Sequence, residues 1–229
     1  DFAELPLVSI SDSQRRPLPW CNWQNTVYHG LPHDLYKFHP EPGKYLAFLG
    51  RVSPEKCPDQ AIELAKRVGI PMKMAAKVDP ADRAYFERVV EPLLDHPLIE
   101  FVGEITDAEK SDFIGNAIGL ICPYDWPEPF GLVLIESLAC GTPVLAYRRG
   151  SIPEIIGHGV TGFISENLDE MVSQVDKLGT IDRNRCRQVF DERFTAQRMT
   201  TDYVKIYQQL ITDAAALPGK SGQQHASNL

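Results

Sequence analysis

The sequence predicts an α/β fold built on a doubly wound parallel sheet, and three observations support this prediction. From about residue 45 onward, short apolar runs alternate with longer stretches of helical periodicity. The apolar runs are almost continuous, which is typical of parallel strands covered by helices on both faces. The 229 residues are 43% hydrophobic and 24% charged, so the chain can bury a sizeable core.

The expected strands and helices follow one another in a regular order. The first strand, residues 45–49, ends at Gly50, and the helix after it has apolar residues at i, i+3, i+4 and i+7 from Ala61 before it stops at Gly69. A capping box at Thr106-x-x-Glu109 starts the helix after the third strand. The other expected strands are residues 71–76, 99–102, 119–123, 143–146 and 162–164, and the other expected helices are residues 80–94, a helix ending at 140–141, and an almost continuous helical stretch up to residue 217.

The first forty residues do not follow this alternation. Residues 7–11 and 26–28 resemble strands, residues 12–16 resemble a helix start, and the segments 30–32 and 40–43 break the chain as a linker would. We interpret residues 1–43 as the end of a preceding domain with its hinge, although an N-terminal extension wrapped on the same domain is an alternative. Because the chain also lacks an initiator Met, we expect it to be cut from something longer.

Composition limits the class of protein. The net charge of −8 and the scattered basic residues argue against nucleic-acid binding. No apolar run is long enough to span a bilayer, and the start lacks the features of a signal peptide, so we expect a cytoplasmic protein without a transmembrane segment. The dispersed cysteines indicate reduced thiols rather than disulfides or a zinc site; they are Cys21, Cys57, Cys122, Cys140 and Cys186.

Two glutamates frame the most informative segment, residues 128–136, which follows the fourth strand and opens a helix. The backbone N–H groups of residues 130–133 should be unpaired there, and such a helix start attracts oxyanions and hydroxyls. Gly131 would let a ligand approach the backbone closely. Glu136 lies inside the helix among apolar residues, where a carboxylate needs a hydrogen-bonding partner such as the vicinal hydroxyls of a ribose. A surface location for either glutamate alone remains the simpler explanation, but the pair with Pro-Phe-Gly between them does not fit it.

A second polar segment, Gly50-Arg51-Val52-Ser53-Pro54-Glu55-Lys56, follows the first strand. The guanidinium of Arg51 and the ammonium of Lys56 are suited to a diphosphate. In open α/β sheets, ligands bind outside the carboxyl ends of the strands, where this segment lies. The sequence has no Asp-x-Asp and no cluster of carboxylates, so we predict no metal and no other cofactor. The G-x-G-x-x-G and P-loop motifs are also absent, which argues against oxidoreductases and P-loop NTPases.

These segments resemble the retaining glycosyltransferases of family four. Three segments match the family: the two glutamates with seven residues between them and Pro-Phe-Gly after the first, the Gly-Arg-x-x-Pro-Glu-Lys segment, and Ala139-Cys140-Gly141-Thr142-Pro143-Val144. Residues 150–154 resemble its Gly-Gly-x-Pro-Glu segment, with Ser151 in place of the second glycine. The resemblance covers about residues 8–212. It implies the C-terminal, Rossmann-like half of a GT-B fold, with a donor-binding domain at 44–195, a crossover helix at 196–217 and, from composition, a disordered tail at 218–229.

The resemblance also implies roles for individual residues. Arg51 and Lys56 would neutralise the departing nucleotide diphosphate, Glu128 would orient the sugar, and Glu136 would bind the ribose. Backbone amides of the glutamate segment would hold the sugar, and the backbone near Ile105 would read the base. The implied catalytic residues are Glu128, Arg51 and Lys56, and the implied donor-binding residues are Arg51, Lys56, Ile105, Glu128, Phe130, Gly131, Leu132, Val133 and Glu136.

The resulting prediction is transfer of a hexose from a nucleotide diphosphate sugar, with UDP favoured because it is common among relatives. The implied partners are the nucleotide-sugar donor and an N-terminal domain that binds the acceptor, so the fragment alone should be inactive. Two alternatives stay open: a non-catalytic nucleotide-sugar-binding domain, whose binding residues would be the same, and a nucleotide-sugar epimerase. The sugar and base of the donor, the acceptor and the oligomeric state do not follow from the sequence.

Overall fold

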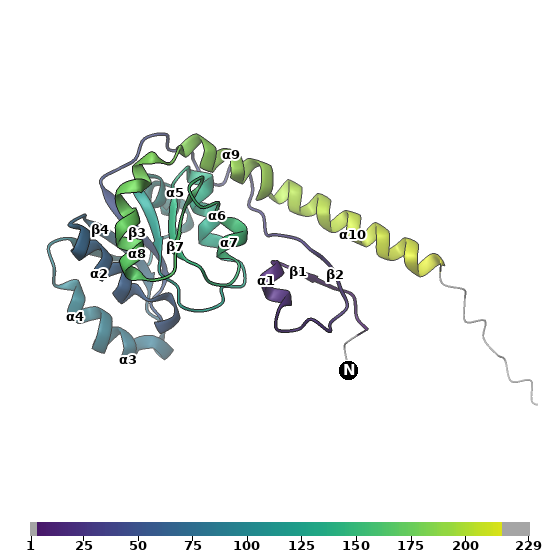
Figure 1. The fold of residues 1–229 in the computed structure, drawn as a ribbon, viewed down its shortest axis with the longest axis horizontal. Coiled ribbons are helices and arrows are strands. Elements are labelled where there is room, and N and C mark those ends of the chain that lie inside the picture. The colour runs from purple at the N-terminus through teal and green to yellow at the C-terminus, as the bar shows by residue number, and fades with distance from the viewer. Residues whose placement is uncertain (1–3, 217–229) are drawn as a thin grey trace, which may run out of the picture.

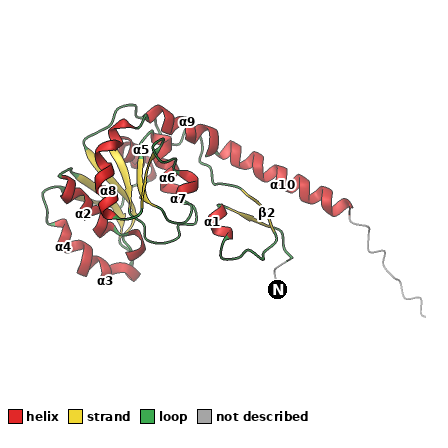
Figure 2. Ribbon diagram, in the orientation of Figure 1, coloured by secondary structure: helices red, strands yellow, loops and turns green. Residues whose placement is uncertain are grey.

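A computed structural model describes residues 4–216 and confirms the predicted α/β class. Six parallel strands form one sheet in the order β5-β4-β3-β6-β7-β8, with helices on both faces (Figures 1 and 2). The strands are β3 (Tyr45–Arg51), β4 (Met72–Lys77), β5 (Ile99–Gly103), β6 (Ala117–Cys122), β7 (Val144–Tyr147) and β8 (Gly162–Ser165).

The strand order makes the sheet doubly wound. From β3 the chain moves outward through β4 to β5, then returns to β6 beside β3 and moves outward the other way to β8. The direction therefore reverses between β3 and β6, and the carboxyl ends of these strands border the crevice in which such sheets bind ligands. Side chains of both central strands are fully buried, for example Leu46 and Phe48 of β3 and Leu120 and Ile121 of β6.

Local signals account for most helix ends. Helix α2 stops at Gly69, which has φ of 70°, and Glu109 accepts a hydrogen bond from the Thr106 N–H at 2.8 Å in the predicted capping box of α5. The helices flanking the sheet are α2 (Pro58–Val68), α3 (Arg83–Tyr85), α4 (Glu91–Leu94), α5 (Asp107–Gly115), α6 (Leu132–Cys140), α7 (Ile152–Ile155), α8 (Leu168–Gln174) and α9 (Arg183–Arg193), with short 3₁₀ turns at Pro54–Lys56, Pro80–Asp82 and Val175–Thr180.

Residues 80–94 are helical throughout, as predicted, but they do not form one regular α-helix. The segment divides into a 3₁₀ turn, α3, a five-residue π-helical stretch at Phe86–Val90, and α4, which contains Pro92. Proline lacks an N–H and its ring collides with the carbonyl four residues earlier, so a regular α-helix cannot continue through Pro92. A wider π turn just before it accommodates the ring.

The N-terminal unit, residues 4–28, consists of β1 (Leu7–Ser9), α1 (Asp12–Arg15) and β2 (Trp23–Thr26). Two details differ from the sequence prediction. β1 ends two residues early because Ser11 is the N-cap of α1, and the second strand ends at Thr26 instead of beginning there. β1 and β2 pair with each other in parallel.

Glu154 at the start of α7 attaches the N-terminal unit to the sheet domain. Its two carboxylate oxygens accept hydrogen bonds at 2.8 Å from the backbone N–H groups of Asp12 and Ser13. The Tyr28 hydroxyl lies 3.2 Å from the same carboxylate. Burial, and then the charges of Glu154 and Asp12, raise the pKa of Tyr28 to about 12, which keeps the phenol neutral.

The last long helix, α10 (Ala196–Ala216), leaves the sheet domain and extends past the N-terminal unit (Figure 1). Where it starts, residue 31 pairs with residue 195, and Arg198 donates hydrogen bonds to the carbonyls of Tyr28 and His29 at 2.7 and 3.0 Å. None of the helices within residues 4–216 is long and apolar enough to cross a membrane. The tail predicted to be disordered lies outside the described residues.

Candidate functional site

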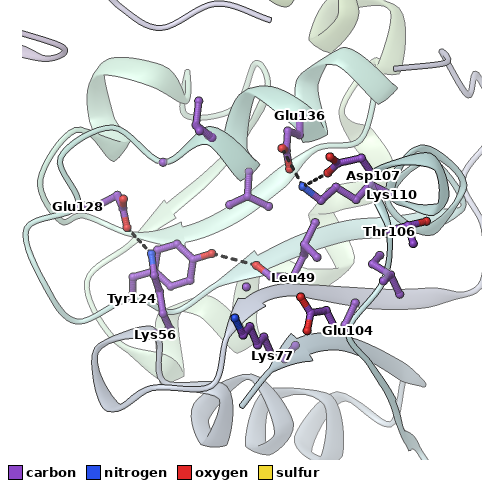
Figure 3. A pocket seen from close by; sticks show the side chains of 17 residues that line it. Leu49, Lys56, Lys77, Glu104, Thr106, Asp107, Lys110, Tyr124, Glu128 and Glu136 are labelled. Carbon is purple, nitrogen blue, oxygen red and sulfur yellow. Dashed lines mark hydrogen bonds and ion pairs between the residues drawn. The ribbon is translucent and has the colours of Figure 1, made fainter. Parts of the chain in front are cut away.

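An open pocket of about 580 Å³ lies at the carboxyl ends of β3 and β6, where the strand direction reverses (Figure 3). Its walls come from the ends of β3, β4 and β5, from the start of α5, and from the loop and first turns of α6. The residues that line it are Leu49, Gly50, Lys56, Ala75, Ala76, Lys77, Glu104, Ile105, Thr106, Asp107, Lys110, Tyr124, Glu128, Gly131, Leu132, Val133 and Glu136.

The N-terminus of α6 presents free backbone donors at this pocket. Gly131 is the N-cap, with φ of 84°. Among residues 4–216, nothing accepts a hydrogen bond from the backbone N–H groups of residues 130–133. These amides lie at the positive end of a nine-residue helix, so they are suited to binding oxygen atoms of a ligand.

Glu128 lies in the loop before α6, and one of its carboxylate oxygens is held by two donors. The ammonium of Lys56 is 2.5 Å from Oε2, and the indole N–H of Trp126 donates to the same atom at 2.9 Å. The ammonium also lies 3.9 Å from the centre of the Tyr124 ring, a cation–π contact. No residue of the described chain hydrogen-bonds Oε1, so this oxygen is free to accept from a ligand.

The backbone of Gly150 packs closely against the backbone of Glu128. With φ of 54°, Gly150 lies so close that a Cβ there would be 2.3 Å from the backbone N and O of Glu128. A residue with a side chain would therefore push the Glu128 loop out of place.

Glu136 lies one turn into α6, and only 8% of the residue is exposed. Its carboxylate is 3.5 Å from the ammonium of Lys110, which is 2.8 Å from Asp107 (Figure 3). Burial lowers the pKa of Lys110, but the hydrogen bond to Asp107 and the charge of Glu136 outweigh it, so the pKa lies above its ordinary value. Burial, followed by the charge of Glu136, raises the pKa of Tyr36. The carboxylate thus lies between a charged ammonium and a neutral phenol.

The structure brings most of the predicted site residues together. Seven of them line the pocket: Lys56, Ile105, Glu128, Gly131, Leu132, Val133 and Glu136. Two do not. Arg51 is half exposed and forms ion pairs with Glu55 at 3.2 Å and Asp79 at 3.7 Å, so its guanidinium does not lie in the pocket with Lys56. The side chain of Phe130 is buried beside the ring of His29, 4.9 Å away between centroids, so it does not reach the pocket.

Several polar and aromatic residues of the site did not follow from the sequence. Trp126 lies two residues before Glu128 and donates a hydrogen bond to it, so its closeness in sequence could have indicated that it belongs to the site. Lys110 is 26 residues from Glu136 and on another helix, so only the packing of α5 beside α6 reveals the pair. Within residues 4–216, no group of three or more His, Cys, Asp or Glu side chains could hold a metal ion.

The fold and the position of the pocket place the protein in the Rossmann-like α/β class, with a ligand crevice at the point where the strand direction reverses. Comparison with known families is more specific. Residues 36–189 match the family described as Glycosyl transferases group 1, and the chain belongs to this family. The family membership predicted from the two glutamates is therefore confirmed.

Relatives of known function match parts of the chain. N-acetyl-alpha-D-glucosaminyl L-malate synthase of Bacillus anthracis is 37% identical over 94 residues, which are 38% of this chain and 25% of that protein. D-inositol 3-phosphate glycosyltransferase of Mycobacterium marinum is 29% identical over 140 residues, which are 59% of this chain and 30% of that protein. The matched regions thus span less than a third of these relatives.

Solved structures show the same fold. Sucrose-phosphate synthase from Thermosynechococcus elongatus superposes with a TM-score of 0.77 at 20% identity, over 91% of this chain and 59% of that one. Anabaena HepE, solved in complex with UDP and glucose, superposes with a TM-score of 0.73 at 18% identity, over 92% of this chain and 63% of that one. The neighbours are GT-B glycosyltransferases, and this confirms the predicted fold.

Proposed function

We propose that this chain is the donor-binding half of a retaining glycosyltransferase that transfers a hexose from a UDP-sugar to an acceptor. The observation that carries the proposal is the pocket, where a buried carboxylate pair flanks a helix N-terminus with four free amides. This combination suits a ligand that has hydroxyls at both ends and negative charge in the middle. Relatives solved with UDP and UDP-glucose support a uridine donor.

The site residues have complementary roles in this proposal. Glu136 accepts hydrogen bonds from the ribose hydroxyls, and the backbone at Ile105, across the pocket, contacts the base. Glu128 uses its free Oε1 to hold the sugar hydroxyls, and the amides of residues 130–132 fix the ring. Glu128 positions the sugar, whereas the departing phosphate assists the incoming hydroxyl.

Lys56 supplies the positive charge for the diphosphate, together with the N-terminus of α6. Its ammonium is paired with Glu128 before the donor binds, and an ammonium has three donor hydrogens, so it can bind a phosphate oxygen without losing this partner. Arg51 must leave Glu55 and Asp79 to reach the same phosphate. We propose that these groups act in place of a metal ion.

The acceptor and the remaining part of the cleft belong to an N-terminal domain in this proposal. The chain covers 63% or less of the first solved neighbours, and residues 4–28 form only a two-stranded unit. We therefore expect the 229-residue chain to bind donor and to transfer little sugar by itself.

Calorimetric titration with UDP, ADP and GDP, with and without EDTA, tests the proposal. We expect saturable binding of UDP that EDTA does not change, and loss of that binding in Glu136→Ala. Binding that needs a divalent cation would refute metal independence. Absence of UDP binding would refute the donor-site assignment. Binding without transfer by a longer chain that carries the acceptor domain would identify a non-catalytic binding domain.

A further inference from the structure

Three consecutive backbone carbonyls precede the free amides of α6, and each accepts a hydrogen bond from outside the loop. The Glu128 carbonyl accepts from the backbone N–H of Ser151 at 2.9 Å. The Pro129 carbonyl accepts from the hydroxyl of Ser11 at 2.6 Å, and the Phe130 carbonyl from the hydroxyl of Ser151 at 2.9 Å. Both serines have no exposed surface, so water does not compete for these bonds.

These anchors determine where two amide N–H groups point. In a trans peptide the carbonyl and the N–H point in opposite directions, and residues 4–216 contain no cis peptide. The Pro129 carbonyl shares its peptide unit with the N–H of Phe130, and the Phe130 carbonyl shares its unit with the N–H of Gly131. Because the serine hydroxyls hold both carbonyls, both N–H groups face away from the serines, and Gly131 forms part of the pocket wall.

We propose that Ser151 is a positioning residue that orients the Gly131 amide toward the donor sugar, and that Ser11 supports it by holding the preceding peptide unit. This inference rests on the proposed function, because it assumes a sugar in the pocket. The serines would not touch the donor. They hold the peptide units in the binding orientation before the donor arrives, so that no ordering cost arises on binding.

Ser11 extends the inference beyond the sheet domain. It belongs to the N-terminal unit, 118 residues away from Pro129 in sequence, and the carboxylate of Glu154 holds the first turn of α1 against α7 next to it. Docking of the N-terminal unit therefore contributes one of the two hydroxyl anchors. The affinity for the sugar moiety should depend on whether that unit is docked.

The test compares the affinities for UDP and UDP-glucose in matched serine variants. In Ser151→Ala we expect UDP-glucose to bind about 10-fold more weakly, while UDP binding changes less than about 2-fold, since the amides contact the sugar. Ser137→Ala is the control, because the Ser137 hydroxyl is equally buried in α6 and donates to the Thr142 carbonyl at 2.9 Å, away from the loop. Ser11→Ala should behave like Ser151→Ala, with Ser9→Ala as the control within the N-terminal unit.

Equal effects on UDP and UDP-glucose, or no effect on either, would overturn the inference. A second measurement does not need a donor. The NMR order parameter of the Gly131 amide should fall from about 0.85 toward 0.6 in Ser151→Ala and stay unchanged in Ser137→Ala. If the wild-type chain bound no UDP, the proposed function would fail, and an unchanged order parameter in Ser151→Ala would separately refute the positioning role.

Discussion

Replacing Glu136 with alanine should remove recognition of the ribose while leaving the fold intact. The carboxylate is nearly buried, and its nearest charged partner is the ammonium of Lys110 at 3.5 Å. Because Lys110 keeps a second partner in Asp107 at 2.8 Å, the substitution does not leave a buried charge unpaired. The variant can therefore be compared with the wild-type chain without a large difference in stability.

The magnitude follows from the hydrogen bonds that the ribose would make. A hydrogen bond to a charged group contributes about 1.5–3 kcal/mol, and about 1.4 kcal/mol corresponds to a factor of ten in affinity. If both ribose hydroxyls donate to Glu136, loss of one of them costs about 10- to 100-fold. The wild-type chain should therefore bind UDP about 10- to 100-fold more tightly than 2′-deoxy-UDP.

Titration calorimetry with the two nucleotides separates ribose recognition from general damage. In Glu136→Ala we expect weaker binding of UDP and a ratio of the two affinities close to one. Glu87→Ala serves as the control, because this exposed glutamate pairs only with Arg83 in the described chain and lies away from the pocket. If Glu136→Ala weakened UDP and 2′-deoxy-UDP by the same factor, Glu136 would not bind the 2′-hydroxyl and the assignment would be refuted.

Four further variants test other groups of the chain. Lys56→Met should weaken UDP binding by about 10-fold or more and Arg51→Met by less, because only Lys56 lines the pocket. If calorimetry gave the opposite order, Arg51 would move into the pocket when the nucleotide binds. Trp126→Phe keeps an aromatic ring but removes the N–H bond to Glu128, so UDP-glucose should bind about 10-fold more weakly while UDP affinity is unchanged; a loss of UDP affinity would contradict a role in holding the sugar. Burial, and then the charge of Arg198, hold the pKa of His29 below its ordinary 6.5. The unfolded chain therefore takes up the proton more readily, and the free energy of unfolding decreases as pH falls below 6.5. Urea unfolding between pH 7.5 and 5 should show a smaller decrease for His29→Asn than for the wild-type chain, and equal decreases would refute the assignment.

The order and type of the elements could be predicted because they depend on local patterns. Continuous apolar runs identified all six strands of the large sheet, and Gly69 and the Thr106 capping box marked helix ends. The prediction gave the extent of the helix at residues 80–94 but not the π turn before Pro92, whose details depend on packing. The end of β1 was predicted two residues too late, since a single residue, Ser11, decides where β1 ends and α1 begins.

For the site, the sequence supplied the residues that chemistry makes unusual. A carboxylate inside an apolar helix and an unpaired helix start are recognisable without coordinates, so Glu136, Glu128 and the amides of residues 130–133 were identified in advance. The same reasoning included Arg51, because a charged side chain near a strand end has no sequence feature that tells which way it points. The structure turns it toward Glu55 and Asp79.

The sequence by itself thus determined the class of fold, the family and the segments from which the site is built. Tertiary structure alone decided which groups meet. Lys56 reaches Glu128 across 72 positions, Lys110 reaches Glu136 from another helix, and Ser11 reaches Pro129 across 118 positions. The physical reason is that secondary structure follows from interactions a few residues apart, whereas the orientation of a carboxylate or an amide is fixed by partners that only the packed sheet and its attached N-terminal unit bring into range.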